Sequence, residues 1–537
     1  MSVVAVQPLE ARLASDTGFL AWFRRPSKPH GRYSIAKFSA LNAYEASPLR
    51  AIVLLAGTPL LPLTAAVVPS FIPLRAPALG IDANAPVFFI HILWVVGMIT
   101  LGTLLHPRPA LRITTTEISY TEVLVISFLS SFQVAGLVIG LAFWWRFPTP
   151  FTWVLLTPFW GVAVALSHVL VLRRRIWGRN NALRERMSSI TPSISVQVSQ
   201  LGLYAGLSAI FERLSTWQQV LILCFFPLYK AGMKRIIRRI GKNLDDFENE
   251  IAVSSVEISL SLYQCMILQG SQSTIATTVL IGIDLVHGVL SVRMFMDKKT
   301  SVPRHSLIAT VRGIVEQDQL DEAALRKFKT RKGPGLQHKT TKSKLLGNST
   351  HSIVPVPVPV MVKEASSTKL ITRRDTKLEL REDWPLSSRE RVSLVVQALE
   401  SLESAETILL VEYLEVAIPL VNCIFLAVAS PLETARYNSK IQAFYYDSER
   451  LWAVIRSIML YTLLQGLSIV FMHVVMRRRY HISAYRVLVF VLDRHALSLV
   501  PKLLAWLALL LHFSVVHYGV DFQFKFDASL PVPDPQT

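Results

Sequence analysis

The feature that most constrains the fold is a series of apolar windows, each about as long as a bilayer is thick. The hydrocarbon core of a membrane is roughly 30 Å thick, so a helix rising about 1.5 Å per residue needs about 20 apolar residues to cross it. Such windows recur through most of the 537 residues, and only 17% of the residues are charged. Ordinary soluble domains cannot bury that much apolar sequence. We therefore expect an all-α, polytopic membrane helix bundle.

About eleven transmembrane helices are predicted, within a range of 10–12. Two windows, 196–211 and 217–233, are shorter and more polar than the others, and their tight connection suggests a helical hairpin. Residues 484–500 contain Arg486, Asp493 and Arg494, so an interfacial amphipathic helix is expected there rather than a span. The nine clear windows are 51–74, 85–105, 122–145, 151–172, 251–269, 274–295, 408–429, 451–476 and 503–520.

The cationic loops indicate the orientation in the membrane. Lys and Arg resist translocation, so short loops that are rich in them stay cytoplasmic. Basic clusters precede the first window and follow the second, fourth, sixth, eighth and tenth, for example at 173–175 and 477–479. This alternation predicts a cytoplasmic N-terminus and an outside C-terminal tail. It also predicts that Asn348, in an Asn-Ser-Thr sequon, is cytoplasmic and never glycosylated.

The chain divides into membrane parts and one long insert. A basic segment (1–50) precedes eight helices (51–296), and three more helices (406–520) lead to a tail (521–537). The insert, 297–405, is rich in polar and basic residues and is expected to be a disordered cytoplasmic loop that ends in a short amphipathic helix. Its polybasic run is predicted to contact anionic lipids at the cytoplasmic face. The cations of this run are Arg326, Lys327, Lys329, Arg331, Lys332, Lys339, Lys342 and Lys344.

Sequence motifs give little evidence of enzymatic chemistry. The chain has no nucleotide-binding glycine loop, no nucleophile elbow and no paired Cys or His spacing for a metal, so we expect no cofactor and no bound metal. The net charge of +19 does not indicate nucleic acid, because the cations lie at the ends of apolar windows. An acidic run at 245–250 could hold magnesium and diphosphate, but neutralisation of the adjacent basic cluster is the simpler interpretation.

Two glycine pairs have the spacing of close helix packing. Gly136 with Gly140, and Gly202 with Gly206, each lie four residues apart within an apolar window. Missing side chains at this spacing let two helix backbones approach closely. We predict packing within the chain, with a dimer seam as the alternative.

Ionisable residues inside apolar windows form the predicted functional site. An unpaired carboxylate there costs about 2.5 to 3.5 kcal/mol, so such residues pair, take up protons or serve function. If the three windows that carry them are neighbours, these side chains lie at similar depth and can meet on the cytoplasmic half of the bundle. Pro419 and Asn422 are predicted to break the helix of window 408–429, as helices at transporter binding sites often do. The predicted site consists of Glu257, Asp284, His287, Glu412 and Glu415.

Three stretches, RYSIAKFSALNAYEASPLR, LLVEYLEVAIPL and VVHYGVDFQFKF, resemble a family of multi-pass transmembrane proteins from oomycetes that has no known function. The resemblance runs through the membrane segments and implies fold and membrane placement, but no substrate or site residue. From the residues themselves, we expect a transporter of a small solute, with proton coupling at the buried acids. A scaffold or receptor-like protein acting through the polybasic insert is the main alternative, and a membrane-embedded enzyme is the third.

Overall fold

The computed structural model describes residues 35–176, 181–211, 214–240, 248–270, 274–296, 307–317 and 388–520. Within these ranges the regular structure is helical, apart from one isolated bridge between Asn438 and Val515. The chain forms two units, one of residues 1–308 with 396–537 and one of residues 309–395. Of the second unit the structure describes 309–317 and 388–395, both helical. The polybasic run at 326–344 and Asn348 lie outside the described residues.

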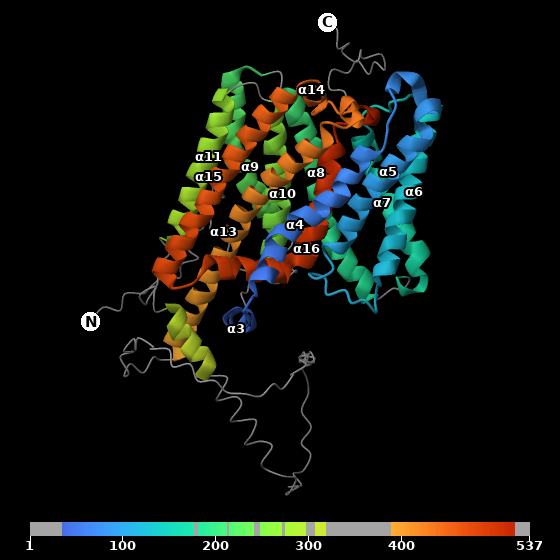
Figure 1. Ribbon diagram of the computed structural model, residues 1–537. Helices are drawn as coiled ribbons and strands as arrows, with labels where there is room; N and C mark the ends of the chain where they lie inside the picture. The colour runs from blue at the N-terminus through green and yellow to red at the C-terminus, as the bar shows by residue number, and fades with distance from the viewer. Residues whose placement is uncertain are drawn as a thin grey trace, which may run out of the picture. The chain divides into compact units, whose positions relative to one another are not determined.

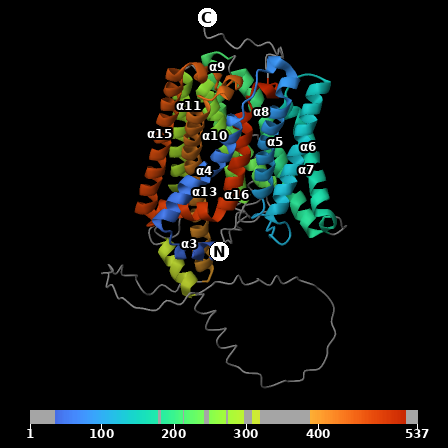
Figure 2. The same ribbon diagram turned by 45° about the vertical axis from the view of Figure 1, so that its right-hand side comes forward.

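Each long helix overlaps a predicted window, although the helices that begin at Ala182 and Ser388 start well before windows 196–211 and 408–429. Figure 1 shows the long helices as a bundle, and Figure 2 shows α10, α11, α13 and α15 on one side of α16, with α5, α6 and α7 on the other. Five short 3-10 segments and the short helices α3 (Ile35–Ala43) and α14 (Gln442–Tyr446) connect or cap them. The long helices are α4 (Pro48–Val67), α5 (Gly80–Leu105), α6 (Tyr120–Trp144), α7 (Thr152–Leu172), α8 (Ala182–Phe211), α9 (Thr216–Ile240), α10 (Glu248–Gly270), α11 (Thr274–Met296), α13 (Ser388–Ala429), α15 (Ser448–Tyr480) and α16 (Ala484–His512).

Six helices in the described part of the chain are long and apolar enough to cross a membrane, which is consistent with membrane localisation. Their outward faces carry large exposed apolar side chains such as Phe128, Trp144 and Leu463. A bilayer would cover these side chains, whereas water would not. The six candidate spans are Pro48–Phe71, Pro77–Leu105, Tyr120–Trp144, Thr152–Leu172, Glu390–Ala429 and Ser448–Tyr480.

Side-chain caps fix where several helices begin. Ser119 and Glu122 form a capping box at the start of α6, with each side chain bonded to the backbone nitrogen of the other residue. Ser47 at α4, Asp447 at α15 and Ser483 at α16 each accept a hydrogen bond from the backbone nitrogen three residues on. These bonds satisfy amides that have no partner within the helix.

Two predictions about helix boundaries are wrong. Residues 484–500 and the span predicted at 503–520 belong to one helix, α16, which ends at His512 and contains Pro501. In Figure 1 its first part lies across the end of the bundle and its second part runs along the other helices. The predicted break at Pro419 and Asn422 is also absent, since α13 continues through both residues to Ala429. Proline removes one backbone hydrogen bond, and the neighbouring bonds and packing keep the helix continuous.

Two helices, α5 and α16, are in close contact at Gly102, a glycine that the sequence analysis did not single out. A Cβ added at Gly102 on α5 would overlap the carbonyl oxygen of Pro501 and lie 2.9 Å from Ala505 Cβ, so α5 and α16 touch through their backbones. At Gly136 and Gly140 on α6 an added Cβ meets no described atom within 4 Å. The predicted packing role of that pair within the chain is therefore wrong. The side-chain surroundings of Gly202 and Gly206 lie outside the described residues.

Because of this contact, we expect a glycine-to-alanine substitution to affect stability differently on α5 and on α6. Gly102→Ala should lower stability by roughly 1 to 3 kcal/mol, because backbone atoms must move apart to admit the methyl group. Gly136→Ala should be neutral, or stabilise by about 0.5 to 1 kcal/mol through higher helix propensity. Thermal denaturation of the purified protein in detergent measures both. Equal melting temperatures for the two variants would contradict the proposed contact.

Candidate functional site

A buried lysine lies between two carboxylates where α9, α10 and α13 meet. Lys230 Nζ on α9 lies 2.7 Å from Glu257 Oε2 on α10 and 2.5 Å from Glu415 Oε1 on α13. The exposed fractions of the three residues are 7%, 0% and 5%. All three lie in helix interiors, so the ammonium replaces its lost hydration with two charged partners.

A second lysine extends this cluster along α9. Lys234, one helical turn after Lys230, forms an ion pair with Glu257. The predicted window 217–233 ends before Lys234, and that boundary is wrong because α9 continues to Ile240. The helix continues because Lys and Arg are good helix formers, and the partly buried Lys234 finds a partner inside the bundle.

Asp284 on α11 connects the cluster to α15. The Tyr461 hydroxyl donates to Asp284 Oδ2 at 2.7 Å, and Gln264 Nε2 on α10 donates to the same oxygen at 3.4 Å. Gln465 Nε2, one turn along α15, donates to the Tyr461 oxygen at 3.2 Å. Asp284, Gln264 and Lys230 also line one small cavity of about 10 Å³, which is room for about one water molecule. Asp284 is therefore held by neutral donors close to the lysine.

The two remaining predicted residues lie at the edges of the cluster. His287, one turn after Asp284 on α11, lines the same small cavity. Glu412 on α13 is 2% exposed and faces α11 and α15, where a Cβ added at Gly288 would lie 3.6 Å from Glu412 Oε1 and 3.4 Å from Ser468 Oγ. Glu412 Oε2 has no hydrogen-bond partner among the described residues.

Carboxylates outnumber cations in this cluster. Lys230 and Lys234 supply two positive charges, whereas the four carboxyl groups of Glu257, Asp284, Glu412 and Glu415 supply up to four negative ones. Buried like charges at this density are costly, and protonation of the carboxyl groups farthest from the lysines removes that cost. The arrangement can therefore take up and release protons.

The predicted residues come together from three helices, and α9, α10 and α15 complete the cluster with residues that the predicted site did not include. The missed members are Lys230, Lys234, Tyr461, Gln264 and Gln465. Lys230 could have been found, because a single lysine inside an apolar window carries the same cost as an acid. Tyr461 and Gln465 are common in apolar helices and gave no such signal. Asn422 lies farther along α13, 1% exposed, and its Nδ2 has no partner among the described residues.

The described residues contain no group of three or more His, Cys, Asp or Glu side chains arranged to hold a metal ion. No family model matches the chain, and comparisons with curated proteins and with solved structures give no match either. The resemblance to the oomycete membrane proteins stays a prediction. The function must therefore be inferred from the geometry of this site.

The ion pairs predict strong coupling between Lys230 and Glu415. Lys230→Met should cost roughly 3 to 5 kcal/mol, because it leaves the buried Glu415 carboxylate without a cation and leaves Lys234 as the remaining ion-pair partner of Glu257. The double variant Lys230→Met with Glu415→Met removes one charge of each sign and should be more stable than the two single effects predict. Melting temperatures of the four proteins in detergent form the test. If the double variant lost as much stability as the two single variants together, Lys230 and Glu415 would not be coupled.

Proposed function

We propose that this chain is a multi-pass membrane transporter of a small solute in which the buried carboxyl groups around Lys230 bind the coupling protons. One observation carries the proposal. Where five helices meet, four carboxyl groups lie near two lysines, so the carboxyl groups outnumber the cations of this cluster. A purely structural ion pair needs equal numbers of opposite charges, whereas a proton-binding site needs a carboxyl group that is neutral in one state.

The connection from Asp284 to Tyr461 and Gln465 supports this assignment. These groups belong to α11 and α15, whereas Lys230 and Glu257 belong to α9 and α10. Protonation of Asp284 would weaken its attraction to the lysine while the Tyr461 hydroxyl could turn to another acceptor. A change of charge at Asp284 would thus alter the contact between two helix pairs, which is the kind of bistable element that alternating access requires.

The proposed architecture has eleven spans. Besides the six candidate spans, α8, α9, α10 and α11 have polar positions in the interior but are long enough to cross, and the part of α16 that runs along the other helices is the eleventh. The shortest, α10 and α11, have 23 residues, which at about 1.5 Å each reach about 35 Å. Three charged residues of these five helices, Lys230, Glu257 and Lys502, are buried in the bundle. With the basic loops inside, the N-terminus is then cytoplasmic.

This orientation is tested at the two ends of α5. Asp82 and Arg112 are both exposed, one at each end of the helix. In intact cells a membrane-impermeant maleimide should label Asp82→Cys but not Arg112→Cys, in a background with Cys224 replaced by Ser, since Cys224 is the exposed native cysteine. Both sites should react after permeabilisation. Labelling of Arg112→Cys alone in intact cells would reverse the orientation.

Transport itself is tested with purified protein in proteoliposomes on a solid-supported membrane. Pulses of amino acids, sugars, organic acids and inorganic cations are applied at several pH values, and a pH-dependent current is expected for one of these classes. Asp284→Asn should abolish the pH dependence, because the amide keeps the contacts to Tyr461 and Gln264 but cannot titrate.

The matched control is Glu449→Gln on α15, which removes an exposed carboxyl group outside the cluster and should leave the current unchanged. A current with the wild-type pH dependence in Asp284→Asn would contradict the proton-binding role. Absence of a current with every solute class would contradict transport.

A further inference from the structure

A large cavity lies between α5, α6, α7 and α8, away from the carboxylate cluster. Its volume is about 1210 Å³, above the roughly 300 to 1,000 Å³ that is usual for small-molecule sites. Aliphatic side chains make up most of its wall, for example Val123 and Ile126 on α6, Val164 on α7 and Ile194 on α8. A space of this size and polarity suits an acyl chain rather than water.

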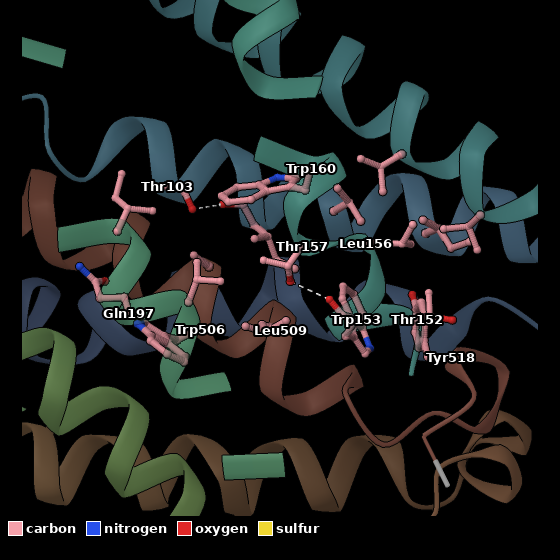
Figure 3. A pocket seen from close by; sticks show the side chains of 18 of the residues that line it. Thr103, Thr152, Trp153, Leu156, Thr157, Trp160, Gln197, Trp506, Leu509 and Tyr518 are labelled. Atoms are coloured by element: carbon pink, nitrogen blue, oxygen red, sulfur yellow. Dashed lines mark hydrogen bonds between the residues drawn. The ribbon is translucent and has the colours of Figure 1, made fainter. Parts of the chain in front are cut away.

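A smaller cavity of about 110 Å³ adjoins it and extends toward the other end of α7. Thr157 and Trp160 on α7 line both cavities, and Trp160 Nε1 donates to Thr100 Oγ1 at 2.9 Å, which holds the indole across α5. Figure 3 shows Trp160 near Thr103 on one side of the smaller cavity, with Trp153 and Tyr518 at the other. The Trp153 and Tyr518 rings lie 4.4 Å apart, so aromatic rings close this end.

The opposite end of the large cavity is cationic. Arg108 and Arg184 line it, and no acidic side chain does so among the described residues. Nearby acids have other partners, since Glu117 pairs with Arg186 and Glu122 with Arg175. Both lining arginines lie near helix ends: Arg108 follows the last residue of α5, Leu105, by three residues, and Arg184 lies in the first turn of α8. The ends of membrane-spanning helices are the depth at which lipid phosphates lie in a bilayer.

The side chain of Arg108 is held in place through one guanidinium nitrogen, whereas the other terminal nitrogen lacks a hydrogen-bond acceptor among the described residues. It is 7% exposed, its Nη2 donates to the Ile118 carbonyl oxygen at 2.6 Å, and its guanidinium lies 4.7 Å from the centroid of the Tyr120 ring. Its Nη1 has no hydrogen-bond partner among the residues that the structure describes. A buried guanidinium nitrogen without an acceptor is costly, and a phosphate oxygen is the acceptor that arginine geometry suits.

From these observations we infer that the cavity between α5, α6, α7 and α8 binds an anionic phospholipid, with its phosphate at Arg108 and Arg184 and an acyl chain running along α7 toward Trp160. This site is independent of the proposed transport function. It fills a gap between helices that their own side chains leave open.

The experiment uses the full-length chain, purified in detergent, and brominated lipids as the probe. Bromine on an acyl chain quenches tryptophan fluorescence at contact range, and Trp160, Trp153 and Trp506 line the cavities. Brominated phosphatidylglycerol should quench with a saturable curve, and brominated phosphatidylcholine with the same chains should bind more weakly. Arg108→Gln should weaken phosphatidylglycerol binding about tenfold, as expected for loss of one charge-assisted hydrogen bond, and Arg108→Lys should restore part of it.

A second variant tests the cavity without touching the arginine. A Cβ added at Gly161 meets nothing within 4 Å, and Gly161 lines the cavity, so the ring of Gly161→Phe has room to enter the cavity and should abolish saturable quenching. Gly140→Phe on α6 is the matched control, because Gly140 is equally open but does not line the cavity. Unchanged quenching in Gly161→Phe, or equal binding of the two lipids by the wild-type protein, would overturn the inference.

Discussion

The ion pairs of Lys230 are the interaction on which half of this bundle depends. An ammonium group that is 7% exposed in an apolar bundle cannot be hydrated, so Glu257 and Glu415 must lie within ion-pair distance of it. That requirement fixes how α9, α10 and α13 are turned about their axes, because a rotation of any one of them would leave a charge unpaired. Hydrogen bonds from Tyr461 and Gln264 to Asp284 then hold α15 and α11 in register with these three helices.

In the other half of the bundle, close backbone contact and the packing of apolar side chains hold the helices together. Between α5 and α16 the missing side chain of Gly102 admits the Pro501 carbonyl oxygen, and the buried second part of α16 packs its apolar side chains against the neighbouring helices. Lys502 Nζ on α16 donates to Ser254 Oγ on α10 at 2.7 Å and so connects the two halves. The large apolar cavity lies in this half, and the carboxylate cluster around Lys230 lies in the other. The proposed solute coupling and the proposed lipid binding thus belong to different parts of the bundle.

Sequence patterns predicted where the long helices occur, because this depends on the length and hydropathy of each segment and not on its neighbours in space. The same local cost identified Glu257, Asp284, His287, Glu412 and Glu415 as residues that need a partner, and the structure brings them close together. Local patterns could not say which helices are neighbours, so Lys230 and Tyr461 were missed as partners. They also misjudged Pro419, where packing keeps α13 continuous, and the glycine pair on α6, where spacing alone does not show that a second helix is near.

The central claim, that the carboxyl groups around Lys230 exceed the nearby cations and hold protons, is tested most directly by infrared spectroscopy of the protein in lipid nanodiscs. Difference spectra between neutral and strongly alkaline solution report the protonated carboxyl groups. The account predicts a protonated-carboxyl band at neutral pH that weakens in Asp284→Asn and persists in Glu449→Gln. A neutral-pH spectrum without any such band would mean that every buried acid is ionised, and would contradict the account.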